Sequence, residues 1–283
     1  MRALRQPGEV LEPRALAVPC GVRALKLTFA AGMGVLDAVS ATFGEHAIDS
    51  AIVRIVGGAF DPLVYVMPAL STDGTRAAWY SETHAPSGRG AIEELVFTHG
   101  RRDDAPFLHC HGTWRHADDS LHAGHLMPHD ACFAEPVQAD VLAISGAVFE
   151  QLDDSETLFK LFTPVALEGE PRPGEKRGVL CRVKPNEDIH AALAHVATEH
   201  GISNGTIHGI GSLVGCDFAD GTHMASIASE LFIRSGTVTS HQEQSAVALD
   251  IVVVDIDGNI FEGPIADGTN AVCITFEVLI VED

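Results

Sequence analysis

Apolar and polar positions alternate with a period of two over several stretches of this chain. The clearest example is the C-terminal stretch 272–280, in which every second residue is a large aliphatic or aromatic one. Successive side chains of a strand point to opposite faces of the sheet, so this pattern predicts a half-buried strand.

A different spacing marks residues 186–201. Apolar residues recur there at Ile189, Leu193 and Val196, which is typical of one buried face of an α-helix. We expect Asn186 to cap the N-terminus of this helix and Gly201 to end it in a left-handed conformation.

The same strand–helix–strand pattern occurs twice. Residues 22–58 align without gaps to residues 176–212, with Glu45-His46 opposite Glu199-His200. Such ordered matching at a fixed offset indicates an internal duplication.

The duplication continues beyond an insertion at about 61–92 in the first copy. The segment ELVFTHG (94–100) matches ELFIRSG (230–236), and each copy closes with another apolar strand. The resulting domain prediction is a leader at 1–21, a first domain at 22–150, a linker at 151–175 and a second domain at 176–283. Proline and glycine in the segment EGEPRPGEKRG predict a linker without regular structure.

The composition fits a globular protein of the cytoplasm. Hydrophobic residues make up 46% of the 283, yet no stretch reaches the about 18 apolar residues of a membrane span. The N-terminal segment is interrupted by charges at Arg5, Glu9, Glu12 and Arg14, so we interpret it as a leader that does not direct export. Six widely spaced cysteines, without a Cys-x-x-Cys pair, argue against a disulfide framework and a thiolate zinc finger.

Charge limits the possible partners. The chain has 18 basic and 39 acidic residues, a formal net charge of −21. Nucleic-acid binding depends on the neutralisation of phosphates, so duplex DNA should be repelled unless basic residues cluster. The adjacent basic pairs are Arg101-Arg102 and Lys176-Arg177, which do not form such a cluster.

Histidines are concentrated in one region of the first copy. On a strand, His109 and His111 would project from the same face about 7 Å apart, and a turn at 117–119 would bring His125 back toward them. Three neutral imidazoles suit Zn²⁺ best, or Ni²⁺, Fe²⁺ or Co²⁺, with a fourth position left for water or a ligand. The sequence therefore predicts a metal site at His109, His111 and His125.

The surroundings of this site can also be predicted. Asp118, Asp119 and Asp130 are candidate acceptors for the second ring nitrogens of the ligands. The alternative is that the histidines only line a solvated strand edge. The neighbouring histidines are expected at the surface; they are His122, His129, His99 and His116. Of these, His122 and His129 are candidate auxiliary ligands.

The second copy lacks the three histidines. In the alignment His109 and His111 fall opposite Asp250 and Val252, and His125 falls opposite Pro264. Neither valine nor proline can ligate a metal through its side chain. We therefore expect no metal at this position of the second copy.

The string FLHCHGTWRHADDSLHAGHL (107–126), followed by the closing strand to Ser145, resembles the PPC (plants-and-prokaryotes-conserved) domain family. The resemblance implies two tandem α+β domains, each a mostly antiparallel sheet packed with one or two helices. It also implies assembly as a trimer, with the histidines near the subunit boundary. Bacterial members carry a DNA-binding label that rests on plant relatives. This chain lacks the Arg-Gly-Arg-Pro hook of those relatives; its nearest strings are SGRGA (87–91) and EPRPGE (170–175).

Three functions remain open at this point. The favoured one is an oligomeric metal-binding protein, a trimer or a pseudo-hexamer of domains, that binds a small ligand or acts as a sensor or scaffold. The second is a zinc-dependent hydrolase or lyase acting on a small polar molecule, with Glu94 or Asp118 as the general base. The third is DNA binding. The insertion at 61–92 is either a lid over the metal or an ordinary surface loop. Three aromatic residues could line a pocket beside the metal: Trp79, Tyr80 and Trp114.

Overall fold

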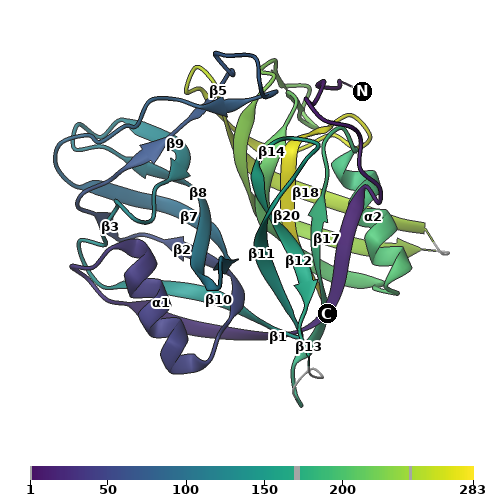
Figure 1. Cartoon of the computed structure of the whole chain (residues 1–283), viewed down its shortest axis with the longest axis horizontal. Helices are drawn as coiled ribbons and strands as arrows, with labels where there is room; N and C mark the ends of the chain where they lie inside the picture. The colour runs from purple at the N-terminus through teal and green to yellow at the C-terminus, as the bar shows by residue number, and fades with distance from the viewer. Residues whose placement is uncertain (1, 169–172, 242–243) are drawn as a thin grey trace.

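A computed structural model describes residues 2–168, 173–241 and 244–283 (Figure 1). Within these residues, 16 strands form one sheet and two helices lie against it. All paired long strands run antiparallel, apart from a single parallel bridge between Glu150 and Arg101. This agrees with the mostly antiparallel sheet predicted from the sequence.

The N-terminal half begins with β1 (Ala15–Phe29), α1 (Val35–His46) and β2 (Ser50–Val56). Its later long strands are β7 (Gly90–Arg102), β8 (Ala105–Arg115), β9 (Leu121–Leu126) and β10 (Val137–Ser145). The order across the sheet is β1-β10-β2-β7-β8-β9.

The C-terminal half repeats this arrangement. It starts with β13 (Lys176–Val183), α2 (Ile189–Glu199) and β14 (Asn204–Leu213). Its later strands are β17 (Ser229–His241), β18 (Gln244–Asp255), β19 (Ile260–Pro264) and β20 (Val272–Glu282). The order β13-β20-β14-β17-β18-β19 matches the first half strand for strand, and β1 pairs with β13 to join the two.

Each half has its own apolar core beneath its helix. The α1 residues Val35, Val39 and Phe43 are buried against the first half of the sheet, and α2 buries Ile189, Leu193 and Val196 in the same way. In Figure 1 the helices lie on the outer sides of the two halves, which face each other across the middle of the molecule.

The ends of α2 are only partly as predicted. Gly201 adopts the expected left-handed conformation, with φ of +65°. The N-cap, however, is Asp188, whose side chain accepts a hydrogen bond from Ala191 N. The prediction of Asn186 is wrong because its amide instead pairs with the backbone of Leu4, at 2.7 and 3.0 Å.

A hairpin fills the middle of the molecule. Strands β11 (Ala147–Asp153) and β12 (Lys160–Ala166) pair with each other, and Phe149 and Phe162 pack in a third apolar cluster between the halves. All of β12 lies in the range 151–175 predicted as a linker. The hairpin buries apolar side chains there. The segment EGEPRPGEKRG, for which the sequence predicts no regular structure, runs into β13 at Lys176, and residues 169–172 lie outside the described residues.

The predicted leader is also part of the fold. Strand β1 starts at Ala15, inside the range 1–21. Before it, Gln6 Nε2 donates to the carbonyl of Cys273 at 2.9 Å, and Gly8 N donates to the carbonyl of Glu156 at 2.9 Å.

Strand β20 is buried on both faces rather than one. Besides the apolar positions of its alternating pattern, Thr275 and Glu277 are 4% and 1% exposed. The sequence pattern predicts one solvated face, but the N-terminal half covers it. This places a carboxylate, Glu277, inside the molecule.

The insertion at 61–92 forms short strands near the top of Figure 1. Strand β4 (Tyr65–Val66) pairs with β9, and β5 (Pro68–Ala69) pairs with β6 (Trp79–Tyr80). The remaining short strands are β3 (Ala59–Phe60), β15 (Cys216–Asp217) and β16 (His223–Met224).

All six cysteines are free, as predicted, and no helix of the described residues is long and apolar enough to cross a membrane.

Candidate metal centre

The three predicted histidines lie together. His109 and His111 are on β8, and His125 on β9 is directly opposite His111 in the antiparallel ladder. The ring centroids are 4.7 Å apart for His109 and His111, 4.9 Å for His109 and His125, and 5.4 Å for His111 and His125.

A fourth candidate ligand comes from the other half of the chain. Glu230, near the start of β17, brings its carboxylate to the three imidazoles, so that one ligand atom of each residue lies within 4.8 Å of the others. Glu230 Oε2 contacts His111 Nε2 directly and is 3.6 Å from His125 Nδ1. The cluster is therefore built from both halves.

The C-terminal half also orients two of the imidazoles. His109 Nδ1 lies 2.9 Å from each carboxylate oxygen of Glu277, which also accepts a hydrogen bond from Thr98 Oγ1. His111 Nδ1 is 2.7 Å from the carbonyl oxygen of Leu231. An acceptor at Nδ1 places the proton on that nitrogen and leaves the Nε2 lone pair available to a metal.

Three polar atoms of the cluster lie close to one another without a hydrogen bond of ordinary geometry. Among the described residues, His111 Nε2, His125 Nδ1 and Glu230 Oε2 are buried and unpaired. A buried polar atom without a partner costs free energy, and here the acceptors face one another. A cation between them would satisfy all three, so these residues fit a divalent metal.

The electrostatics keep two of the ligands, His125 and Glu230, in metal-binding form, whereas they favour a proton on His109 that a metal would have to displace. Burial lowers the pKa of His125 to about 4, so its imidazole is neutral at pH 7. Burial alone would raise the pKa of Glu230, but the adjacent His111 and His125 lower it well below its ordinary value, so the group is ionised. Burial opposes protonation of His109, yet the Glu277 carboxylate raises the pKa of this histidine.

Sequence reasoning missed Glu230 and Glu277. One signal was available for each: Glu230 begins the repeated ELxxxxG segment, and Glu277 interrupts an otherwise apolar strand. The predicted acceptors do not have that role. The carboxylate of Asp118 accepts a hydrogen bond from Ser120 N instead, and Asp119 and Asp130 are exposed.

The other histidines of the region lie outside the four-residue cluster. His116 and His122 stack on each other with centroids 3.7 Å apart, and His122 Nε2 is 2.9 Å from Ser120 Oγ. His129 lies beside Phe107. His99 is buried beside Phe43, contrary to the surface position expected for it, because it lies on β7 under helix α1.

In the C-terminal half, the guanidinium of Arg234 occupies the place that corresponds to the histidine cluster. In the β18–β19 ladder Val252 pairs with Glu262, so Glu262 and not Pro264 stands where β9 has His125. The Arg234 guanidinium donates to Asp250 at 2.8 Å and to Glu262 at 3.0 Å. Burial alone would lower the pKa of Arg234, but these carboxylates raise it, so a fixed side-chain cation stands between them.

The insertion covers one side of the cluster. The Tyr80 ring is 5.1 Å from the His125 ring, edge to face. A cavity of about 50 Å³ is lined by Tyr80, His109, His111, Glu230 and other residues, including Trp79. Trp114, in contrast, is fully buried in the core and packs at a tilt against Tyr65, away from this cavity.

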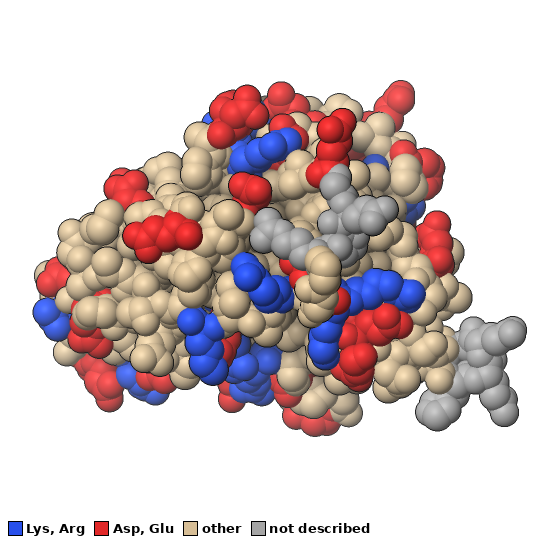
Figure 2. Space-filling view, turned by 90° about the horizontal axis from the view of Figure 1, so that it is seen from below, with Lys and Arg blue, Asp and Glu red and all other residues tan. Residues whose placement is uncertain are grey.

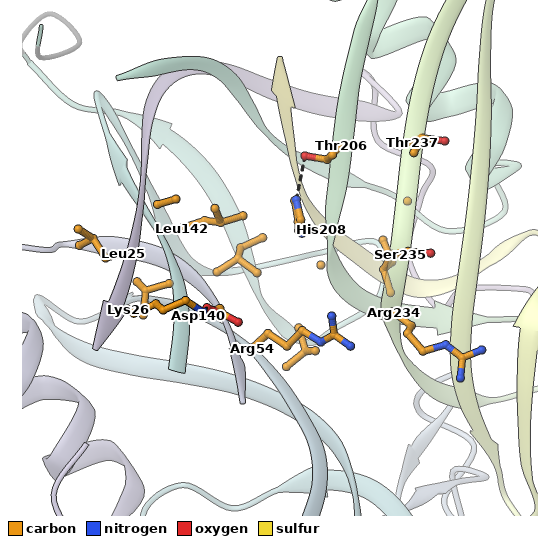
Figure 3. Close-up of a pocket in the computed structure, with 17 residues that line it drawn as sticks. Leu25, Lys26, Arg54, Asp140, Leu142, Thr206, His208, Arg234, Ser235 and Thr237 are labelled. Atoms are coloured by element: carbon orange, nitrogen blue, oxygen red, sulfur yellow. Dashed lines mark hydrogen bonds and ion pairs between the residues drawn. The ribbon is translucent and has the colours of Figure 1, made fainter. Parts of the chain in front are cut away.

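A larger cleft of about 560 Å³ lies between the two halves (Figure 3). Arg54 and His208 point into it, whereas the guanidinium of Arg234 turns away. Its basic side chains are paired with acids: Arg54 with Glu94 at 2.6 Å, and Lys26 with Asp140. On the face shown in Figure 2, basic side chains gather near the middle, with acidic side chains beside them.

The fold and the cluster together define an antiparallel β protein with a candidate metal centre. Residues 171–282 match the family model of the Plants and Prokaryotes Conserved (PCC) domain. This is the family predicted above under the name PPC, and the match confirms that prediction for this part of the chain.

Solved structures similar to this chain include three from prokaryotes. A plant- and prokaryote-conserved protein of Pyrococcus horikoshii is 14% identical, with a TM-score of 0.42, over 52% of this chain and 96% of that one. A metal-containing protein of Archaeoglobus fulgidus is 21% identical, with a TM-score of 0.41, over 52% and 94%. A "putative DNA-binding protein" of Bacteroides thetaiotaomicron is 15% identical, with a TM-score of 0.38, over 50% and 96%. No curated protein matches the chain.

Proposed function

We propose that this protein binds a divalent metal ion, preferably Zn²⁺, through His109, His111, His125 and Glu230. The observation that carries the proposal is the convergence of buried, unpaired ligand atoms from two strands of one half and one strand of the other. Imidazole and carboxylate ligands are those that Zn²⁺ takes in proteins.

The number of protein ligands favours a structural or sensing role over catalysis. Four side chains complete a tetrahedral shell, as in structural zinc sites, whereas catalytic zinc keeps a position for water. The hydrolase or lyase hypothesis needs that open position. The adjoining cavity of about 50 Å³ has room for a few waters or a comparably small ligand, which sets the size of any ligand beside the metal.

We further infer that the chain is a tandem pair of PCC-type domains, 22–150 and 176–283, whose metal joins them. The matching strand order of the halves supports this. Self-association as a trimer of such pairs, implied by the family resemblance, stays a prediction that the mass in solution would test. The paired basic residues of the cleft and the net charge of −21 weigh against DNA as a partner.

Metal analysis of the protein prepared without a histidine tag tests the proposal. Wild-type protein should retain one tightly bound metal ion after dialysis. His111→Ala should lose it, because the variant removes a buried ligand. Glu230→Gln should bind about 10- to 100-fold more weakly, and Glu277→Gln should weaken binding in the same range by releasing the His109 ring.

His122→Ala is the matched control, since this histidine lies on β9 but faces His116 and Ser120. It should retain the metal with unchanged affinity. Wild-type protein that binds no divalent ion, or a His111→Ala variant with wild-type affinity, would show the proposal to be wrong.

A further inference from the structure

We propose a second metal site in the C-terminal half, formed by Asp188, His190 and Asp267, that takes Zn²⁺ or a similar transition-metal cation. It uses none of the residues of the first centre and does not depend on the function proposed for that centre. One ligand atom of each of the three residues lies within 4.8 Å of the others.

Two neighbouring elements bring these residues together. Asp188 caps the N-terminus of α2 and His190 lies in its first turn. Asp267 comes from the connection between β19 and β20. This connection is fixed to the helix, because Ile189 N donates to the carbonyl of Asn270 at 3.0 Å and Asn270 N donates to Asp188 Oδ2 at 3.1 Å.

The observation that points to a ligand is the state of His190. Its side chain is 3% exposed, and its Nδ1 atom is buried without a hydrogen-bond partner in the described part of the chain. This nitrogen is 4.0 Å from Asp267 Oδ1. An unpaired buried ring nitrogen is unfavourable, and a cation held between it and the two carboxylates would remove that cost.

The donor set defines the class of cation. One imidazole and two carboxylates suit Zn²⁺, Co²⁺ or Mn²⁺, whereas Ca²⁺ and Mg²⁺ prefer oxygen ligands alone. Asp188 already accepts hydrogen bonds from Ala191 N and Asn270 N. A carboxylate has about four acceptor positions, so it can still ligate a metal. The two negative charges outweigh the partial positive charge of about +0.5 at the helix N-terminus.

The second site should bind more weakly than the first. The Asp267 side chain is 86% exposed and loses conformational freedom when it ligates. Waters would complete the coordination. In the internal repeat, Asp188 and His190 align with Gly34 and Leu36, so the N-terminal half lacks the equivalent ligands.

Zn²⁺ titration of the metal-free full chain, in competition with a chromophoric chelator, tests the proposal. Wild-type protein should bind two equivalents with different affinities. Asp267→Asn and His190→Ala should each weaken the second equivalent at least 10-fold and leave the first unchanged. His111→Ala should lose the first and keep the second.

Two matched variants serve as controls. His195 lies on the exposed side of the same helix, with a side chain 76% exposed, and Asp257 is an exposed aspartate in the β18–β19 turn. His195→Ala and Asp257→Asn should bind two equivalents like the wild type.

The proposal would be overturned if the second equivalent bound with wild-type affinity to the Asp267→Asn variant. This variant decides the question even if His190→Ala fails to fold, because Asp267 is exposed. A wild-type chain that binds one equivalent, which His111→Ala removes, would overturn the second site alone. If the His111→Ala variant still bound two equivalents, and the Asp267→Asn variant lost one of them, the first centre alone would be overturned.

Discussion

His99 and His111 show how differently a buried imidazole can be used within one fold. Both are almost fully buried, at 4% and 2% exposure. His111 faces a carboxylate and fits a metal, whereas His99 packs edge to face on Phe43, with ring centroids 4.8 Å apart. Burial lowers the pKa of His99 to about 4. Its role is therefore that of a neutral core residue.

We expect His99 to make folding stability sensitive to mild acid. Its ordinary pKa is about 6.5, so below that pH the unfolded chain binds a proton that the folded protein excludes until about pH 4. Stability is therefore lost as the pH falls through this window, by about 1.4 kcal/mol per pH unit from this group. Denaturant unfolding of His99→Leu between pH 7 and pH 4 should show a shallower decline than the wild type.

The exposed His46 provides the comparison. His46→Leu is the matched control, because this histidine lies at the exposed end of α1 and not in the core. Parallel pH profiles of wild type and His99→Leu would contradict the assignment of His99 as a neutral core residue.

At the scale of elements, buried charges attach the β11–β12 hairpin to the rest of the molecule. Asp154, in the hairpin turn, accepts a hydrogen bond from the Arg182 guanidinium on β13 at 2.7 Å. Glu156, in the same turn, forms an ion pair of 2.7 Å with Arg14, the residue just before β1. The side chains of Asp154 and Arg182 are only 5% and 3% exposed. The hairpin is therefore held by ion pairs as well as by its aromatic residues.

Asp154→Asn should lower the free energy of unfolding by about 3 kcal/mol, because it leaves the buried Arg182 charge without its partner. Burial alone would raise the pKa of Asp154, but Arg182 lowers it, so the pair persists at neutral pH. Urea unfolding at pH 7 measures the change. The adjacent Asp153→Asn, whose side chain is 87% exposed, should change stability by no more than about 0.5 kcal/mol. Equal effects of the two variants would contradict a structural role for the Asp154–Arg182 pair.

At the scale of the whole molecule, the candidate metal centre lies where the two halves meet. His109, His111 and His125 come from β8 and β9, and Glu230 and Glu277 come from β17 and β20. Every ligand of this centre belongs to one chain. Its assembly therefore requires the two halves to be packed together, and metal binding should be coupled to that packing.

We expect Zn²⁺ to stabilise both halves in a single unfolding transition. At a free metal concentration 1,000-fold above Kd, binding adds about 4 kcal/mol to the stability of the folded state. Calorimetry of the Asp267→Asn variant, with and without Zn²⁺, isolates the centre between the halves. We expect one transition, which Zn²⁺ moves to higher temperature. Introducing His111→Ala into the Asp267→Asn variant should abolish this shift. Two transitions, of which metal moves only one, would contradict the coupling.

The sequence by itself determined the features that depend on local order. The periods of apolar residues gave the strands and α2, the repeat gave the common order of elements, and the alternation of side chains on a strand put His109 and His111 on one face with His125. These patterns are readable because they repeat over a few residues. The family was predicted from the motif at 107–126 in the first half, and the family model matches residues 171–282 of the second half.

Only the tertiary structure decided what surrounds the histidines. Glu230, Glu277 and the Leu231 carbonyl reach them because one half packs on the other, and no local pattern encodes a contact over more than a hundred residues. The same packing buries the second face of β20. The register puts Glu262 in place of His125 because the β18–β19 ladder ends two residues after Val252, whereas the β8–β9 ladder ends four residues after His111. Local periodicity thus fixes which face a side chain takes, whereas its partner across the interface depends on the fold of the entire chain.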